Sequence, residues 1–123
     1  MTKMRQQVGQ KGEEAAHEYL KGQGYSIVET NYRCKLGEID IIARDGSTVV
    51  IVEVRTKTGL TFGRPEESIT REKARKLHLL ALQYLQSHYH REISSRIDLV
   101  AVMVDRSSGK VKNLKHIKNI LAG

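Results

Sequence analysis

Asp40 and Glu53 are the residues of this chain whose types and spacing are best suited to chemistry. Both lie in residues 37–57, GEIDIIARDGSTVVIVEVRTK, where two runs rich in β-branched residues flank an Asp-Gly dipeptide. Such a dipeptide between apolar runs predicts two antiparallel strands joined by a tight turn. Counting back from the turn, Glu38 faces Glu53, and Asp40 is the diagonal neighbour of Glu53, about 7–8 Å away between Cα atoms. The stretch therefore predicts three carboxylates that converge on one face of a hairpin.

The register of this hairpin follows from taking Asp45 and Gly46 as its two turn residues, which places Ile42 opposite Val49. Side chains alternate with period two, so each strand presents one set of residues to each face. The expected core face consists of Ile39, Ile41, Ala43, Val50, Val52 and Val54. The other face carries Glu38, Asp40, Ile42, Val49, Ile51, Glu53, Arg55 and Lys57. The apolar residues of this second face indicate that another element covers part of it.

A bound cation is one reason for the three acids to converge, because like charges that face each other destabilise a sheet. Carboxylates with no His or Cys among them suit an oxygen-preferring ion such as Mg²⁺ or Mn²⁺. The alternative is an exposed face whose acids pair with Arg44, Arg55 and Lys57. A three-residue turn with a bulge would also change the register.

Asp40 is separated by twelve residues from Glu53-Val54-Arg55. This arrangement resembles the nuclease signature PD-(D/E)XK in its small, resolvase-like form. The whole chain is similar to the YraN family of bacterial proteins, which is grouped with Holliday-junction resolvases and restriction endonucleases. The likeness rests on the pattern G-x-x-G-E-x-x-A-x-x-Y-L at residues 9–20 and on the blocks GEIDIIARDG, EVRTK, FGRPEESI and RIDLVAV.

This resemblance implies a restriction-endonuclease-like α/β fold with a central mixed sheet flanked by helices. It also implies a metal-dependent endonuclease that hydrolyses phosphodiester bonds in DNA, including branched or structured DNA. The implied ligands of Mg²⁺ or Mn²⁺ are Asp40, Glu53, the Val54 carbonyl and, from the first helix, Glu13.

The signature has Lys two residues after the Glu, whereas this chain has Arg55 there and Lys57 two residues further on. The resemblance therefore implies that the catalytic cation is Arg55, Lys57 or Lys73. Arg holds a phosphate well but stays protonated, whereas the pKa of Lys can shift, so Arg gives the weaker catalyst. Two other classes stay open, a nucleic-acid-binding module of the same fold with weak or no turnover and a protein-interaction domain.

Charge points to a polyanionic partner. Lys and Arg number 21 against 14 Asp and Glu, a net charge of +7 that is large for 123 residues. Nucleic acid, expected to be DNA, fits this excess. With no Trp and one Phe, stacking on bases is less favoured than contacts to a duplex backbone.

The length predicts one domain over residues 1–123. The longest apolar run, residues 99–104, is too short to span a bilayer, and the N-terminus lacks the apolar core of a signal peptide. The single Cys34 cannot form an internal disulfide, in agreement with a reducing compartment. We expect a cytoplasmic protein without a membrane partner, and the sequence leaves open whether it forms a homodimer.

Periodicity and turn residues predict the order αβββαββ. The expected elements are a helix at 3–22, strands at 25–33 and on both sides of the Asp-Gly turn, a helix from about 71 to 90, and strands at 97–104 and 111–117. Glu13 is expected on the side of the first helix that packs against the protein, and Glu14 on its solvent-exposed side. Glu13 either pairs with a basic residue beneath the helix or contributes to the metal site.

Further candidates surround the hairpin. The loop at residues 58–68 contains Arg64 and is either functional or disordered. Lys73 lies in line with the buried stripe of the second helix and is expected to point inward. The nucleic-acid-binding candidates are Arg64, Arg71, Arg75 and Lys76. Glu38 and Asp98 are secondary candidates for the site; an acid at the start of a strand is more often a satisfied hydrogen-bond acceptor.

Overall fold

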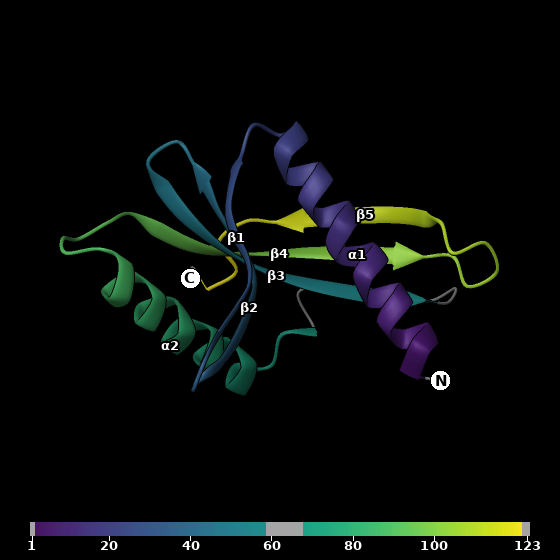
Figure 1. Ribbon diagram of the computed structural model, residues 1–123, viewed down its shortest axis with the longest axis horizontal. Coiled ribbons are helices and arrows are strands. Elements are labelled where there is room, and N and C mark those ends of the chain that lie inside the picture. Colours follow the sequence, from purple (N-terminus) through teal and green to yellow (C-terminus); the bar gives the residue numbers. More distant parts are fainter. Residues whose placement is uncertain (1, 59–67, 122–123) are drawn as a thin grey trace.

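The computed structural model describes residues 2–58 and 68–121, without the side chains of residues 2–5. Its elements are α1 (Thr2–Gly22), β1 (Ser26–Cys34), β2 (Gly37–Asp45), β3 (Thr48–Thr58), α2 (Arg71–His88), β4 (Ser95–Val104) and β5 (Val111–Ile117) (Figure 1). This is an α/β fold with the predicted order. Neither helix, within the described residues, is long and apolar enough to cross a lipid bilayer.

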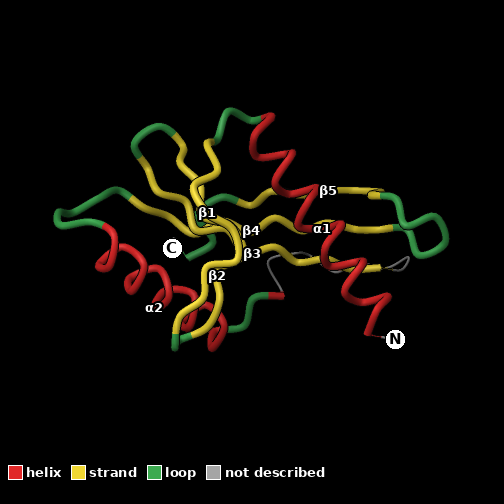
Figure 2. The backbone as a smooth tube through the Cα atoms, in the orientation of Figure 1, coloured by secondary structure: helices red, strands yellow, loops and turns green. Residues whose placement is uncertain are grey.

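The five strands form one mixed sheet in the order β1-β2-β3-β4-β5. β3 and β4 are parallel, and the other neighbours are antiparallel. A parallel pair needs a long crossover, and α2 lies in the connection from β3 to β4 (Figure 2). β4 is buried from Ile97 onward, which confirms the prediction from its apolar run.

The two helices cover opposite faces of the sheet, so alternate residues of β3 enter different cores. Val50 and Val52 pack with Ala16 and Leu20 of α1. On the other face, Val49 and Ile51 pack with a stripe of α2 that includes Leu77, Leu80, Ala81 and Tyr84. The predicted cover over the second face of the hairpin is therefore α2.

α2 begins where its sequence predicts. Thr70 is the N-cap, and its hydroxyl accepts a hydrogen bond from the Lys73 backbone N–H at 3.1 Å. The helix then presents its apolar stripe to the sheet, which fixes the side on which Lys73 and Lys76 lie.

The turn between β2 and β3 differs from the prediction. Asp45 pairs with Thr48, so Gly46 and Ser47 form the turn, and Gly46 has φ +62°. Glycine at the first turn position satisfies a type II′ turn, which leaves Asp45 in the strand. The register moves by two residues, so Ile42 faces Ile51 rather than Val49. An even shift keeps each of these side chains on its predicted face.

Ile39 is a second correction to the predicted core face. It packs in the cluster beneath α2, next to Ile42, whereas Ile41 packs beneath α1. β1 and β2 bend strongly away from the direction of the other strands (Figure 1), and β1 contains a bulge between Ile27 and Glu29. Strict alternation does not predict contacts across such a bend.

Gly12 marks the closest approach of α1 to β3. A Cβ atom there would lie 2.8 Å from both Cβ and Cγ2 of Thr56. We expect Gly12→Ala to lower the free energy of unfolding by about 1–3 kcal/mol through overpacking. Urea unfolding would measure this.

The control is Gly9→Ala in the same helix, where a Cβ would meet no atom within 4 Å. It should stabilise the protein by about 0.5–1 kcal/mol through helix propensity alone. Equal effects of the two substitutions would contradict the close approach, and Thr56→Ala should recover part of the loss caused by Gly12→Ala.

Candidate functional site

A cleft of about 300 Å³ lies between the bent part of β2, the middle of β3 and the first half of α2. Its walls are Glu38, Asp40, Glu53, Val54, Arg55, Lys73, Lys76, Leu77 and Leu80. The structure thus brings together the three acids that the hairpin predicted. It also adds cations from α2, so negative and positive groups share one small space.

Asp40 is positioned by a gap in the sheet. Pairing between β2 and β3 extends from the turn to Ile41 and Val52 and does not continue beyond them. The backbone N–H of Val54 instead donates to Asp40 Oδ2 at 2.8 Å. Asp40 therefore lies against the backbone of β3, immediately beside Glu53.

Glu53 is nearly buried, with 7% of the residue exposed. Its Oε2 atom lies 3.3 Å from Lys73 Nζ and 3.4 Å from Arg55 Nε. The alternative prediction was that the acids of this face pair with nearby cations. Glu53 does pair with one of them, Arg55. Arg44, the other proposed partner from the turn, donates to the Tyr89 hydroxyl instead, at 2.9 Å.

Arg55 is only partly satisfied by these contacts. Its terminal nitrogen donates to the Ser68 carbonyl at 3.5 Å. Its Nε atom is buried and, although close to Glu53, makes no hydrogen bond to any described residue. A buried donor without an acceptor costs free energy, so this cleft contains a donor suited to an additional oxygen ligand.

Asp40 in the cleft and Glu13 on α1 both resist ionisation. The pKa of Asp40 is raised from 3.8 to about 7, mainly by burial and further by the charges of Glu53, Glu13 and Glu38, although the Val54 N–H opposes the shift. The pKa of Glu13 is also raised, first by burial and then by the charge of Glu38. A bound cation would relieve the same repulsion.

This raised pKa predicts that stability falls as pH rises. Between pH 3.8 and about 7 the folded protein holds a proton on Asp40 that the unfolded chain has lost. The stabilisation is complete below the lower value and lost as pH rises through the upper one. We expect the free energy of unfolding to fall by about 2–4 kcal/mol across this range without divalent ions.

Urea unfolding at a series of pH values in EDTA would measure this fall. Asp40→Asn should flatten it, because the amide does not titrate and still accepts the Val54 N–H. The same pH profile for wild type and variant would show that Asp40 titrates normally in the folded protein.

Glu38 lines the cleft but does not face Glu53 as predicted. Its carboxylate accepts a hydrogen bond from Arg33 Nε at 2.6 Å, across the β1-β2 pair. The two-residue change of register is the reason, because it removes Glu38 from the position opposite Glu53.

Glu13 lies on α1, outside the walls of the cleft. It is half-buried, while Glu14 is exposed, in agreement with the predicted sides of the helix. It lines a neighbouring hollow with Glu14, His17 and Asn31. Its charge nevertheless raises the pKa of Asp40, so the two carboxylates interact.

The predicted cations separate into two groups. Lys73 and Lys76 line the cleft with Arg55. Lys57, Arg71 and Arg75 are exposed and do not line it. Arg64 lies outside the described residues. Of the three candidates for a catalytic cation, the structure thus places Arg55 and Lys73 at the acids, and Lys57 elsewhere.

The donor set fits a hard divalent cation of the Mg²⁺ type. Asp40 and Glu53 supply carboxylate oxygens, and Val54, whose carbonyl is the third expected ligand, lies beside them in the wall of the cleft. Among residues 2–58 and 68–121, no three His, Cys, Asp or Glu side chains are grouped as metal ligands. Mg²⁺ is commonly held by only one or two carboxylates, with waters and substrate phosphates completing its shell.

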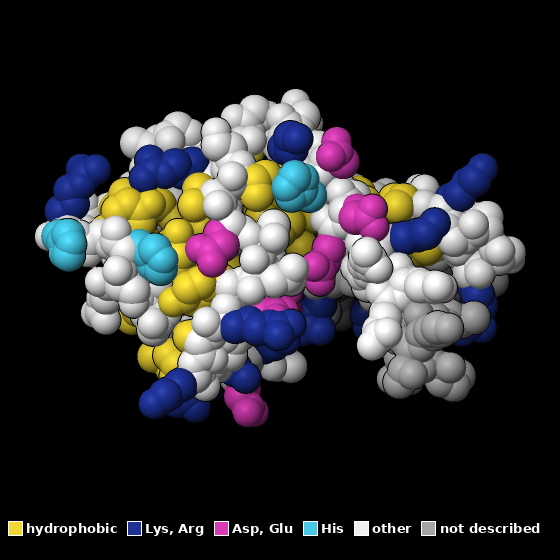
Figure 3. Space-filling model, viewed as in Figure 1, with side chains coloured by type: hydrophobic (Ala, Val, Ile, Leu, Met, Phe, Trp, Pro, Cys, Tyr) yellow, Lys and Arg dark blue, Asp and Glu magenta, His cyan; other side chains and the backbone are white. Residues whose placement is uncertain are grey.

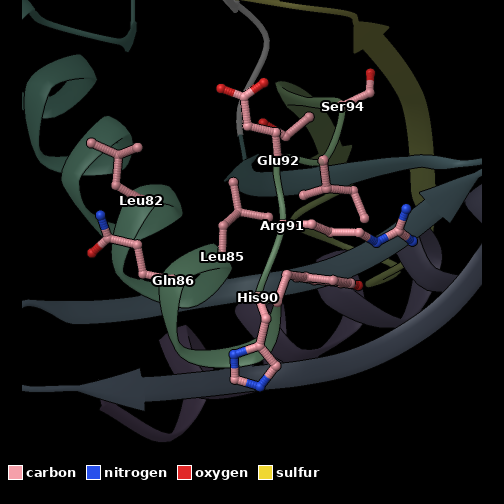
Figure 4. Close-up of a pocket in the computed structure, with 10 residues that line it drawn as sticks. Leu82, Leu85, Gln86, His90, Arg91, Glu92 and Ser94 are labelled. Carbon is pink, nitrogen blue, oxygen red and sulfur yellow. The ribbon is translucent and has the colours of Figure 1, made fainter.

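A larger hollow of about 980 Å³ lies at the C-terminal end of α2 (Figure 4). Leu82, Leu85 and Gln86 line it from the helix, and residues 89–95 from the segment that follows. Glu92 is the single acid among the described residues that line it, and these residues contain no carboxylate pair. We therefore assign the candidate site to the smaller cleft on its chemistry rather than on size.

Figure 3 shows acidic and basic side chains next to each other on the face of the molecule drawn there.

Asp98, the secondary candidate on β4, belongs to a separate buried network. It is 0% exposed and accepts hydrogen bonds from Arg96 Nε, His116 Nε2 and the Asn119 N–H, at 3.0, 2.8 and 2.9 Å. His116 Nδ1 lies 3.1 Å from the Tyr19 hydroxyl of α1. These contacts lie on the α1 side of the sheet, away from the cleft. The alternative that Asp98 is a satisfied acceptor is therefore confirmed.

His116 and Arg96 were not predicted as partners of Asp98. Asp98 itself was the available signal, because a buried acid in an apolar strand requires donors nearby. Which neighbouring residues supply them depends on the β4-β5 register and on the strand's connection to residue 119, neither of which the sequence pattern gives.

The sequence has many relatives, and the three named here share one description. The profile of the uncharacterised protein family UPF0102 matches residues 12–102. A UPF0102 protein of Desulforamulus reducens is 46% identical over 98% of this chain and 100% of its own length. Another from Pelotomaculum thermopropionicum is 44% identical over 97% and 98%. A third, from Moorella thermoacetica, is 47% identical over 96% and 98%. The chain belongs to the UPF0102 family, which is the YraN family that its motifs resemble.

Proposed function

We propose that this protein is a metal-dependent nuclease that hydrolyses phosphodiester bonds in DNA, with a restriction-endonuclease-like fold of the PD-(D/E)XK type. The observation that carries the proposal is the cleft in which Asp40 and Glu53 lie beside Lys73 and Arg55. The proposed fold is supported by the order of elements: a helix, three antiparallel strands, and a second helix that connects β3 to the parallel strand β4.

Asp40 and Glu53, with the Val54 carbonyl, are the residues that would hold Mg²⁺ or Mn²⁺. Such an ion supplies Lewis-acid polarisation of a phosphoryl oxygen when it is bound. The chain's own part is to keep two carboxylates fixed, one by the Val54 N–H and the other by burial in β3. Glu13 acts on Asp40 through its charge.

Lys73 and Arg55 supply positive charge at the same place. A phosphodiester in the cleft would meet the Lys73 ammonium and the buried Nε donor of Arg55, which lacks a hydrogen bond within the described residues. Preorganised cations of this kind stabilise the charge that develops on a phosphate during transfer. Lys73 takes the role of the Lys that the nuclease signature has at the position of Arg55.

DNA is the proposed partner because the chain has a net charge of +7 and few aromatic residues. Lys76 extends the positive wall of the cleft, and Arg71 and Arg75 lie on the exposed side of the same helix. These three residues are proposed to contact backbone phosphates. A location in the cytoplasm, where DNA and Mg²⁺ are both present, is part of the same proposal.

The second candidate is a nucleic-acid-binding module of the same fold with weak or no turnover. The observation that favours it is Arg55, which stays protonated and cannot act as a base. Retention of DNA that is independent of metal and declines steeply with salt, without cleavage, would support this candidate.

Cleavage assays on duplex and branched DNA, with Mn²⁺ or with EDTA, test the proposal. Wild type should cut only with the metal. Lys73→Gln should lower the rate by about 10²–10³-fold, because it removes a charge that lies 3.3 Å from Glu53. Lys57→Gln is the matched control: it removes the same charge from an exposed position and should change the rate little.

Arg55→Lys belongs in the same assay, because it restores the signature without a change of charge. We expect it to raise metal-dependent cleavage. If neither wild type nor Arg55→Lys cuts any substrate with Mn²⁺, the nuclease proposal is wrong and the binding module is the better account.

A further inference from the structure

Two of the three cations that line the cleft among the described residues, Lys73 and Arg55, are engaged by one carboxylate. Lys73 Nζ and Arg55 Nε lie 3.3 and 3.4 Å from the same oxygen of Glu53. Glu53 is 7% exposed, so its carboxylate is largely desolvated, whereas the side chains of Lys73 and Arg55 are 39% and 31% exposed and stay partly screened by water. Among the described residues, Lys73 makes no second ion pair; the Arg55 Nε makes no hydrogen bond there, although a terminal nitrogen of Arg55 donates to the Ser68 carbonyl.

A phosphate and Glu53 therefore compete for the same two positive groups. An incoming phosphate would displace a buried carboxylate from its partners and leave that charge uncompensated, which is costly. A divalent cation on Glu53 removes this cost, because the carboxylate then has another positive partner. The cleft thus has an acidic half and a basic half that neutralise each other when neither has a ligand.

We propose that Lys73 and Arg55 form a binding site for a DNA phosphate that Glu53 blocks until a divalent cation binds that carboxylate. This inference rests on the proposed function, since it takes Glu53 as a metal ligand. Metal and DNA are then linked ligands: each raises the affinity of the protein for the other by the same factor.

The first experiment needs no metal. Fluorescence anisotropy with a labelled DNA duplex in EDTA compares wild type, Glu53→Gln and Glu38→Gln. Both variants lose one negative charge from the cleft, but Glu38 pairs with Arg33, which does not line it. Glu53→Gln should bind about tenfold more tightly than Glu38→Gln, because it frees two charged donors.

Salt dependence separates freed contacts from a general change of charge. Two additional phosphate contacts should steepen the slope of log affinity against log salt by about 1–2 for Glu53→Gln. Lys73→Gln introduced into Glu53→Gln should remove most of the gain, and circular dichroism would confirm that each variant is folded.

The second experiment adds Ca²⁺, with a denaturing gel to confirm that the DNA stays intact. Ca²⁺ should tighten DNA binding by wild type about tenfold and leave Glu53→Gln nearly unchanged. Calorimetry with Ca²⁺ should show the reciprocal gain when DNA is present.

Equal affinities of Glu53→Gln and Glu38→Gln in EDTA would overturn the inference, as would a gain that survives Lys73→Gln. Metal-dependent cleavage with such a result would leave the proposed function intact. Conversely, tighter binding by Glu53→Gln without cleavage by wild type would support the blocked site and contradict the nuclease.

Discussion

The double substitution Asp40→Asn, Glu53→Gln should abolish the heat of Mn²⁺ binding in calorimetry and lower metal-dependent cleavage by at least about 10³-fold. Both carboxylates line the cleft, and they are close enough that the charge of Glu53 helps to raise the pKa of Asp40. A hard cation is held mainly by anionic oxygens, and the amides that replace them are neutral. The loss of Mn²⁺ binding and of cleavage should therefore far exceed the loss caused by substituting any other pair of acids.

The substitutions are chosen to leave the fold in place. Asn keeps an oxygen that accepts the Val54 N–H, and Gln keeps the shape of a side chain that is almost fully buried. Thermal unfolding followed by circular dichroism would show whether the double variant is folded. Loss of Mn²⁺ binding in a folded protein then reports on the site alone.

Glu14→Gln, Glu18→Gln provides the matched control. It removes the same two negative charges from exposed positions of α1 that do not line the cleft. Its Mn²⁺ heat and its cleavage should stay close to those of wild type. If the two double variants bind Mn²⁺ equally, the ion is held elsewhere and the cleft is not a metal site.

The spacing of apolar residues predicts the helices and strands of this protein well, because each of these elements depends on local backbone geometry. The apolar run of β4 and the stripe of α2 each correspond to burial that the structure confirms. The position of Lys73 follows from the same logic: one helical turn before Leu77, it had to face the sheet. For this reason the sequence alone predicted that a lysine of α2 points toward the acids of the hairpin.

Features that depend on how elements meet were predicted less well. The Asp-Gly dipeptide predicts a turn but does not decide whether Asp45 or Gly46 is its first residue. The predicted register of β2 against β3 was therefore wrong by two residues. The core position of Ile39 depends on a bend of β2, and the ion pair of Glu38 with Arg33 depends on β1. Whether Lys57 reaches the site depends on the course of β3 past the cleft, and there it is exposed.

Asp98→Ala should destabilise the protein by about 3–5 kcal/mol in urea unfolding at neutral pH. The carboxylate is fully buried, and its removal leaves Arg96 Nε and His116 Nε2 without the acceptor that they share. Burial would raise the pKa of Asp98, but the hydrogen bonds from His116, Asn119 and Arg96 outweigh it and lower the pKa. The ionised form is thus the one that the fold stabilises.

Asp45→Ala is the matched control, because it removes another carboxylate partner of Arg96. That ion pair is 3.1 Å long but 45% of the Asp45 side chain is exposed, so its loss should cost about 1 kcal/mol or less. Equal effects of the two substitutions would show that burial of the Asp98 network contributes little.

A further variant, Asp98→Asn, tests the two roles considered for Asp98. A structural acid that lies on the α1 side of the sheet should, when changed to Asn, lower stability and leave the metal dependence of the folded protein as it was. A residue of the site would behave in the opposite way, with Mn²⁺ binding lost at unchanged stability. Calorimetry on Asp98→Asn at a temperature where it remains folded separates these outcomes. We expect the first, because the hydrogen bonds that this carboxylate makes within residues 2–58 and 68–121 all lie inside the network, and none of them reaches the cleft.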